Sequence, residues 1–363
     1  MWPYWLLFFV PALLALQETV TGRASPGRLT SRSRMSVGWW LSISALTLMV
    51  GWRHEVGGDW FNYLNNLQNA YYESSFVEWW LNDPGYRLLE WLALQNGWEV
   101  HGVNLMAGAI FSVGLTFFCR SLPRPWLAMA VAVPYMVIIL GMGYSRQGVA
   151  LGLLMLGLVW LGRGDVLRFV VWTVVAALFH KSAVLLLPMA ALAASKRRLF
   201  SAVWVGVVVA AAYTVLLADS VETLRVNYLE AGYQSEGAMI RLTMNALPAA
   251  LLLWKQERFT VTLPQGRLWF WFSVTALGLL VLYFFSPSST AVDRVGLYLL
   301  PLQLMVFSFM PEVLGSKNGF GNKHWVIAVV AYYGAVQFVW LNFATHAFAW
   351  VPYRWYPIEL IFN

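Results

Sequence analysis

Charged and polar side chains at the ends of apolar segments are the residues of this sequence that could do chemistry. Arg146 and Gln147 open the apolar stretch of residues 147–162, and Tyr144 precedes them. A charge close to hydrocarbon is costly unless it is paired or solvated, so it is a candidate for a functional site. The planar guanidinium of arginine suits two-pronged binding of phosphate oxygens. These residues therefore predict a phosphate-binding site, the alternative being that Arg146 only extends to the membrane interface.

A second candidate interrupts the next apolar segment. His180 and Lys181 separate the apolar pieces 169–179 and 182–195. Membranes tolerate such a break only inside protein or along a wet cavity. Histidine titrates near neutral pH and suits general-base work or a hydrogen bond to phosphate. His180 is therefore predicted to be functional, against the alternative of a satisfied packing residue.

Two further stretches place polar groups at the start of a predicted helix. In "AVDRVGLYL", Asp293 and Arg294 precede Tyr298 by about one helical turn; the pair could bind substrate or only cap the helix. In "EVGGDWFNYL", Asp59 precedes Tyr63, and its carboxylate could deprotonate a sugar hydroxyl or cap the helix. The remaining substrate-binding candidates are Lys181, Arg53, Arg241, Tyr353 and Arg354. Tyr353 and Arg354 lie in an aromatic tail whose main expected role is that of an interfacial anchor, so they are secondary candidates.

Composition assigns these residues to a membrane protein. Of the 363 residues, 60% are hydrophobic and only 11% are charged, whereas soluble domains carry about 25% charged residues. The single cysteine excludes an internal disulfide framework, and no metal-binding or nucleotide-binding motif is present. The net charge of +7 is assigned to loops that orient helices, so no nucleic-acid partner is expected.

Charge asymmetry predicts the topology. If the pieces around His180 form a hairpin, most of the basic residues fall in cytoplasmic loops, whereas a single span would invert everything downstream. The hairpin predicts a single domain, residues 1–363, with about twelve membrane segments and both termini outside. The first apolar run lacks a preceding basic residue and is expected to be a retained helix. Residues 53–100 are expected to form short amphipathic helices at the outer face, and residues 219–241 a second outer loop. The predicted apolar segments are 2–19, 35–52, 101–119, 125–142, 147–162, 169–179, 182–195, 199–218, 242–254, 268–286, 295–311 and 325–343.

Five short stretches, in the order given below, make the sequence resemble the EpsG-like, Wzy-type polysaccharide polymerases. They are "GGDWFNYL", "SRQGVALGLLMLGL", "ALFHKSAVLLLP", "DRVGLYLLP" and "VPYRWYP", which extend from about residue 53 to 356. The resemblance implies an all-α, GT-C-like membrane glycosyltransferase. It further implies that oligosaccharide repeat units carried on undecaprenyl pyrophosphate are joined at the outer, periplasmic face of the bacterial cytoplasmic membrane. Product classes would be O-antigen, capsule or exopolysaccharide, and a flippase and a chain-length regulator would be partners.

Carried onto this sequence, the family pattern marks Asp59, Arg146, Gln147, His180 and Arg294. The residues themselves agree with this chemistry, because a lipid pyrophosphate needs cations and an acceptor hydroxyl needs a base. Sugars stack on aromatic faces, for which the outer segment offers Trp60, Tyr71, Tyr72, Trp79 and Trp80. Cations can stabilise the leaving group without a metal, so metal independence is expected. The alternatives are a lipid-linked sugar flippase or other transporter, an O-antigen ligase and an acyltransferase.

Overall fold

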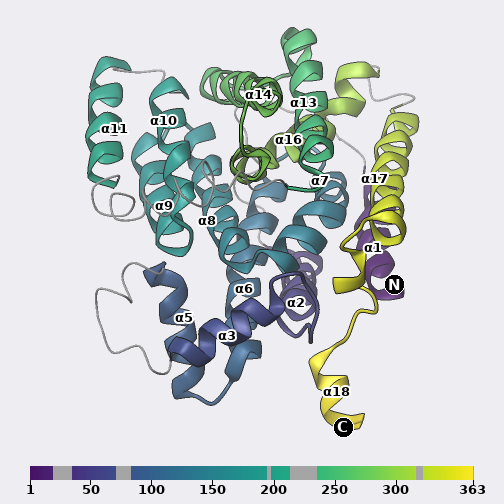
Figure 1. The fold of residues 1–363 in the computed structure, drawn as a ribbon. Coiled ribbons are helices and arrows are strands. Elements are labelled where there is room, and N and C mark those ends of the chain that lie inside the picture. The colour runs from purple at the N-terminus through teal and green to yellow at the C-terminus, as the bar shows by residue number, and fades with distance from the viewer. Residues whose placement is uncertain (19–34, 71–82, 194–197, 213–234, 316–321, 363) are drawn as a thin grey trace.

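The computed structural model describes residues 1–18, 35–70, 83–193, 198–212, 235–315 and 322–362. Within these ranges the chain forms helices joined by short connections, as expected for an all-α protein (Figure 1). Several expectations fall outside the described residues. They concern Tyr71, Tyr72, Trp79, Trp80 and most of the predicted outer loop 219–241.

The helices of the N-terminal half begin close to where the apolar runs begin. They are α1 (Trp2–Gln17), α2 (Val37–Gly51), α3 (Trp60–Ala70), α5 (Pro84–Gln95), α6 (Glu99–Arg120), α7 (Pro125–Ala132), the π-helix η1 (Val133–Gly141) and α8 (Ser145–Gly162). Proline lies in the first turn of α5 and of α7, where its missing N–H is not needed for hydrogen bonding. Both α3 and α5 lie in the segment predicted to form short amphipathic helices.

The remaining helices complete the bundle. They are α9 (Val166–Phe179), η2 (Lys181–Leu186), α10 (Leu187–Ala193), α11 (Arg198–Ala212), α13 (Ala238–Trp254), η6 (Gln256–Arg258), α14 (Leu263–Tyr283), α15 (Ser289–Gly296), η7 (Leu297–Leu299), α16 (Pro301–Leu314), α17 (Lys323–Phe343), η8 (Ala347–Ala349) and α18 (Tyr356–Phe362). Each apolar segment predicted from the sequence overlaps at least one of these helices, although several helices begin or end a few residues beyond the predicted bounds.

In the part of the chain that the structure describes, four helices are long and apolar enough to cross a membrane: α6, α8, α14 and α17. A fifth candidate is the pair formed by α15–η7 and α16, which is bent by 47°. The other apolar helices of the described residues are shorter, so a total of about twelve membrane segments stays a prediction. The apolar segment predicted at 295–311 falls on this bent pair, which begins earlier, at Ser289, and is bent before Pro301.

Close packing of small residues fixes α8 at the centre of the bundle. A Cβ atom added to Gly114 of α6 would lie 2.0 Å from the carbonyl oxygen of Gly152. A Cβ atom added to Gly152 would lie 2.8 Å from the Cα atom of Phe111. Such approaches require glycine, so Gly114 and Gly152 allow the backbones of α6 and α8 to come into close contact. This contact fixes the height of α8, and with it the position of Arg146 at its start.

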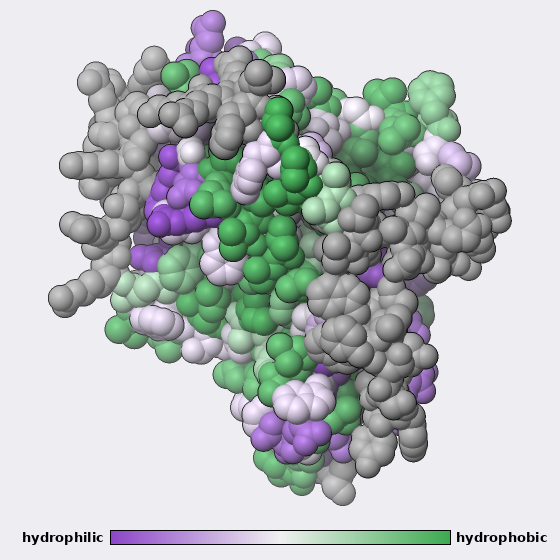
Figure 2. All heavy atoms as spheres, turned by 90° about the vertical axis from the view of Figure 1, so that its left-hand side faces the viewer, coloured by the Kyte–Doolittle hydropathy of each residue, from purple (hydrophilic) through white to green (hydrophobic). Residues whose placement is uncertain are grey.

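The predicted break at His180 is present. Helix α9 ends at Phe179, His180 has an extended backbone (φ −156°, ψ 110°), and η2 starts at Lys181. After the break, α10 packs against α9 and α11. Apolar residues cover much of the described surface in the view of Figure 2. Exposed apolar side chains of α9 and α11 include Leu167 and Val207. A lipid environment accommodates such a surface.

A charged cluster joins three helices at the other end of the bundle. Arg124, just before α7, donates to one carboxylate oxygen of Glu312 in α16 from Nε at 2.9 Å and from Nη2 at 2.6 Å. Its Nη1 donates to the carbonyl oxygen of Glu18, just after α1, at 3.2 Å. The ends of α1, α7 and α16 that lie away from Arg146 are thereby tied together.

Candidate functional site

A cavity of about 300 Å³ lies at the start of α8. Its lining is almost entirely polar, and comprises Asp59, Asn62, Tyr63, Asn66, Asp83, Tyr144, Arg146, Gln147, His180 and Arg294. Seven of these ten were candidates from the sequence, although they come from stretches up to 235 residues apart (59 to 294). The fold therefore brings the predicted polar groups from separate helix ends into one place.

A polar stripe on α3 forms one wall of the cavity. Asp59, Asn62, Tyr63 and Asn66 follow the spacing i, i+3, i+4 and i+7, which places side chains on one face of a helix. Asn62 donates to the Asp59 carboxylate at 3.4 Å. Asn62 and Asn66 were not predicted to line a site, but the spacing of the polar residues would have revealed them.

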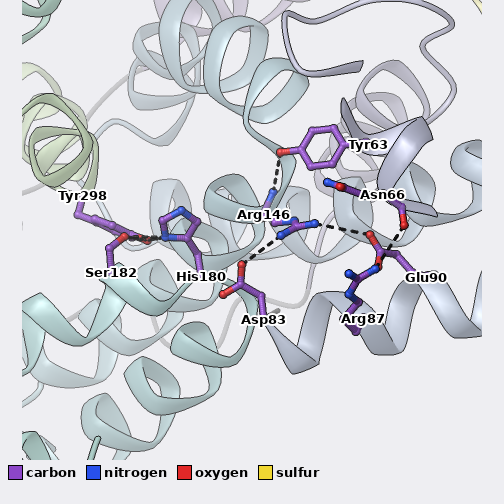
Figure 3. A network of polar contacts seen from close by, with 9 residues as sticks. All are labelled: Tyr63, Asn66, Asp83, Arg87, Glu90, Arg146, His180, Ser182 and Tyr298. Atoms are coloured by element: carbon purple, nitrogen blue, oxygen red, sulfur yellow. Dashed lines mark hydrogen bonds and ion pairs between the residues drawn. The ribbon is translucent and has the colours of Figure 1, made fainter. Parts of the chain in front are cut away.

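Arg146 is the centre of an ion-pair network (Figure 3). Its guanidinium lies 3.5 Å from the carboxylate of Asp83 and 3.8 Å from that of Glu90. Glu90 is itself paired with Arg87 at 2.8 Å, one turn earlier in α5. The Arg146 guanidinium also lies over the ring of Tyr86, 5.0 Å from its centroid, which adds a cation–π contact. The predicted cation is thus held by two acidic partners that the sequence analysis did not name.

Asp83 connects the outer segment to the break at His180. It precedes α5 in a left-handed backbone conformation (φ 60°, ψ 77°), which is uncommon for a residue other than glycine. Its carboxylate accepts a hydrogen bond from the backbone N–H of Lys181 as well as contacting Arg146. Burial raises the pKa of Asp83, and the charges of Arg146 and Lys181 oppose that rise.

His180 is held by two hydroxyl groups. Its Nδ1 lies 2.6 Å from the Ser182 hydroxyl and 3.2 Å from the Tyr298 hydroxyl, and the Ser182 hydroxyl donates to that of Tyr298 (Figure 3). Burial, together with the charges of the nearby Arg294 and Arg146, lowers the pKa of His180 to about 3. The imidazole is therefore neutral at physiological pH and suited to hydrogen bonding. Tyr298 does not line the cavity but positions a residue that does.

Arg294 lines the cavity, while its neighbour Asp293 accepts a 2.6 Å hydrogen bond from Nε of Arg241. Both residues lie in the last turn of α15, whose first residue is Ser289, so they do not cap the start of the helix. Gln147 donates from Nε2 to the carbonyl oxygen of Arg294 at 2.8 Å, which ties α15 to the start of α8. Across the cavity, burial raises the pKa of Asp59, and the charge of Arg294 opposes the rise.

Six predicted binding residues do not line the cavity. They are Lys181, Tyr298, Arg53, Arg241, Tyr353 and Arg354. Arg354 forms an exposed ion pair with Glu55, and Tyr353 donates to the carbonyl oxygen of Met49 at 2.8 Å. The aromatic tail thus packs against the end of α2, where Trp355 forms a backbone bridge with Arg53.

Of these six residues, Arg53 is buried among hydrogen-bond acceptors and does not line the cavity. Its side chain is 1% exposed and donates to two backbone carbonyl groups, to Asn104 at 2.9 Å and to the Ser145 hydroxyl at 2.8 Å. The guanidinium also lies over the ring of Trp60. Arg53 therefore joins α2 to α6 and to Ser145, the first residue of α8. Through Ser145 it helps to fix the backbone position of the adjacent Arg146.

Comparison with protein families decides which class of protein this is. The model of the EpsG family matches residues 38–355, which is most of the chain. The chain belongs to the EpsG family. The resemblance drawn from the five stretches is thereby confirmed, and EpsG membership suggests a role as a polysaccharide polymerase in a membrane. No curated protein and no solved structure is significantly similar to it.

The cavity of this EpsG-family protein contains both cationic side chains and carboxylates. Arg146 and Arg294 can bind an anion, while Asp59 and Asp83 can accept a proton. His180 can donate or accept a hydrogen bond. Among the described residues no group of three His, Cys, Asp or Glu side chains is arranged to hold a metal ion. Metal independence stays a prediction for experiment.

Proposed function

We propose that this protein is a membrane glycosyltransferase that polymerises oligosaccharide repeat units carried on undecaprenyl pyrophosphate. The reaction takes place at the outer, periplasmic face of the bacterial cytoplasmic membrane and contributes to O-antigen, capsule or exopolysaccharide synthesis. The observation that carries the proposal is the cavity in which Arg146 and Arg294 meet two carboxylates and His180. Membership of the EpsG family supports the same reaction class.

The arginines suit the donor. Its pyrophosphate is the leaving group and gains negative charge as the bond to the sugar breaks, so cations that face it lower the barrier. Arg146 offers a planar pair of N–H donors, and Gln147 fixes the backbone of Arg294 beside it. We assign pyrophosphate binding to Arg146 and Arg294, which requires no metal ion.

The other groups suit the acceptor. A hydroxyl of the second repeat unit attacks the anomeric carbon of the donor and must lose its proton as it does so. Two carboxylates, Asp59 and Asp83, face the space in which that hydroxyl would lie. The neutral imidazole of His180 and the amides of α3 provide hydrogen bonds for sugar or phosphate oxygens.

The test is the glycan ladder of a deletion strain complemented with wild type, Arg146→Ala or Arg168→Ala, with membrane expression measured for each. Arg168 is a matched control, because it pairs with Asp165 near the opposite end of α8. We expect wild type and Arg168→Ala to restore the ladder, and the deletion and Arg146→Ala to give single repeat units. An unchanged ladder in the deletion strain would refute the polymerase.

The intermediates that accumulate in the deletion strain, and the side of the membrane on which they accumulate, separate the alternatives. Single units still attached to the final acceptor indicate that a separate ligase acts downstream and that this protein polymerises. Loss of all transfer to the final acceptor, with full-length lipid-linked polymer accumulating, would indicate a ligase instead. Accumulation of lipid-linked units on the cytoplasmic side would indicate a flippase.

A further inference from the structure

We propose that Asp83 is a displaceable counter-ion of Arg146 and the base that accepts the proton of the acceptor hydroxyl. This inference rests on the proposed function and adds a catalytic residue to it. In the resting state Asp83 pairs with Arg146. When the donor pyrophosphate binds Arg146, it takes the place of Asp83 and leaves that carboxylate free beside the reacting sugars.

The two acidic partners of Arg146 differ in a way that supports exchange at one of them. Glu90 is 2% exposed, lies inside α5 and shares its charge with Arg87 at 2.8 Å. Asp83 is 14% exposed and lines the cavity; it lies 3.5 Å from Arg146, slightly closer than Glu90 at 3.8 Å, but it has no arginine partner among the described residues of α5. Glu90 is therefore a fixed partner that keeps the guanidinium in place, whereas Asp83 is the partner that a cavity ligand can replace.

The backbone at Asp83 supports a functional role. A non-glycine residue in the left-handed region costs free energy, and such residues cluster at functional sites. Pro84 follows directly, which fixes the start of α5 and so the position from which the Asp83 side chain enters the cavity. The hydrogen bond from Lys181 N–H aims the carboxylate between Arg146 and the break at His180. This bond does not involve Arg146 and would persist when the ion pair is broken.

The remaining candidates for the base fit less well. His180 is neutral but binds a proton only under strongly acidic conditions, because its pKa is lowered to about 3. Asp59 receives a hydrogen bond from Asn62, and the charge of Arg294 lowers its pKa more than the charge of Arg146 does. Loss of the Arg146 charge to the donor removes the influence that most opposes the raised pKa of Asp83. Donor binding therefore makes Asp83 more basic at the moment when a base is needed.

The step balances as follows. The acceptor oxygen forms a bond to the anomeric carbon of the donor sugar while its proton passes to the Asp83 carboxylate. The bond between that carbon and the pyrophosphate oxygen breaks, and its electron pair leaves with undecaprenyl pyrophosphate, held by Arg146 and Arg294. The protonated Asp83 then returns its proton to solvent and pairs again with Arg146 when the product leaves.

The experiment compares Asp83→Asn with wild type in lipid nanodiscs. Affinity for undecaprenyl pyrophosphate is measured by direct binding, and turnover by polymerisation of lipid-linked repeat units extracted from the deletion strain. Asparagine tolerates the left-handed backbone, so the fold is expected to persist; Asp83→Gly provides a second variant with the same tolerance. We expect unchanged or tighter product binding and turnover reduced about 100- to 10,000-fold, the usual contribution of a general base.

The pH profile gives a readout that a structural role would not move. Wild-type turnover should fall on the acid side as Asp83 becomes protonated, at a pH above the ordinary aspartate pKa of 3.8, because burial raises it. This acid limb should be absent from the residual activity of Asp83→Asn. Glu236→Gln, a matched change in an exposed carboxylate outside the cavity, should leave binding, turnover and the limb unchanged.

The outcomes separate this inference from the function on which it rests. If wild type neither binds undecaprenyl pyrophosphate nor extends the repeat units, both are wrong. If wild type does both and Asp83→Asn has normal turnover, or keeps an acid limb that Asp59→Asn loses, only the role of Asp83 is wrong. If both Asp83 variants lose product binding together with turnover, Asp83 is a structural anchor of the site and not a displaceable base.

Discussion

Replacement of Arg146 by lysine tests whether the shape of the cation matters as well as its charge. Lysine keeps one positive charge, but presents it as a point on a flexible chain. In the structure the guanidinium lies between the carboxylates of Asp83 and Glu90 and over the ring of Tyr86. A single ammonium group cannot keep the contacts to Glu90 and Tyr86 while it also binds a pyrophosphate with two parallel N–H donors.

The size of the effect follows from the contacts that lysine loses. One hydrogen bond between charged groups contributes about 1.5–3 kcal/mol, and the weakened cation–π contact about 0.5–1 kcal/mol. The total of about 2–4 kcal/mol corresponds to a roughly 30- to 700-fold loss of affinity for undecaprenyl pyrophosphate. The glycan ladder should shorten accordingly, because fewer sites hold a donor at a given lipid concentration.

The assay is equilibrium binding of undecaprenyl pyrophosphate to wild type and Arg146→Lys in nanodiscs, with ladder length measured in the complemented strain. Equal thermal stability of the two proteins establishes that the site and not the fold has changed. Affinity within threefold of wild type, together with a normal ladder, would refute the two-pronged binding of pyrophosphate by Arg146.

Two further predictions concern the support of the site and its chemistry. Arg53→Gln should lower the free energy of unfolding by about 3 kcal/mol, since it leaves several buried acceptors, among them Asn104 and the Ser145 hydroxyl, without their charged donor; an unchanged unfolding midpoint in detergent would contradict the bridging role. Turnover in membranes should persist in the presence of EDTA, because the cavity provides two arginines for the leaving group; loss of activity that magnesium or manganese restores would show that a metal is required.

The helices were largely predictable because hydrocarbon imposes a simple requirement. Backbone groups in a membrane must be satisfied internally, so long apolar runs become helices, and a polar pair such as His180-Lys181 inside one indicates a break. The bend before Pro301 was harder to predict from the sequence. At the bend, carbonyl groups near the end of α15 accept hydrogen bonds from side chains. The donors, Gln147 and Asn245, lie on other helices.

The site was predictable where a residue's chemistry conflicted with its surroundings. Arg146 and Arg294 stood out as cations against apolar segments, whereas Asp83 lies in a mixed aromatic and charged stretch where a carboxylate is unremarkable. Arg53 had the same sequence signature as Arg146 but a different role. An arginine satisfied by neutral carbonyl, amide and hydroxyl groups looks like a binding residue until its partners are known, and two of these partners are 51 and 92 residues away.

The contacts of Arg124 with Glu312 and with the end of α1 make one end of the bundle harder to open than the other. A carrier that alternates its access must separate its helices at each end in turn, and at this end that would pull a buried guanidinium from its carboxylate. At the Arg146 end, by contrast, the cation is shared between two carboxylates, that of Asp83 at 3.5 Å and that of Glu90 at 3.8 Å, and Asp83 lines the cavity. Separating the helices would therefore break a buried ion pair at the Arg124 end, whereas at the Arg146 end a ligand could enter by exchange with one counter-ion, as the proposed reaction requires.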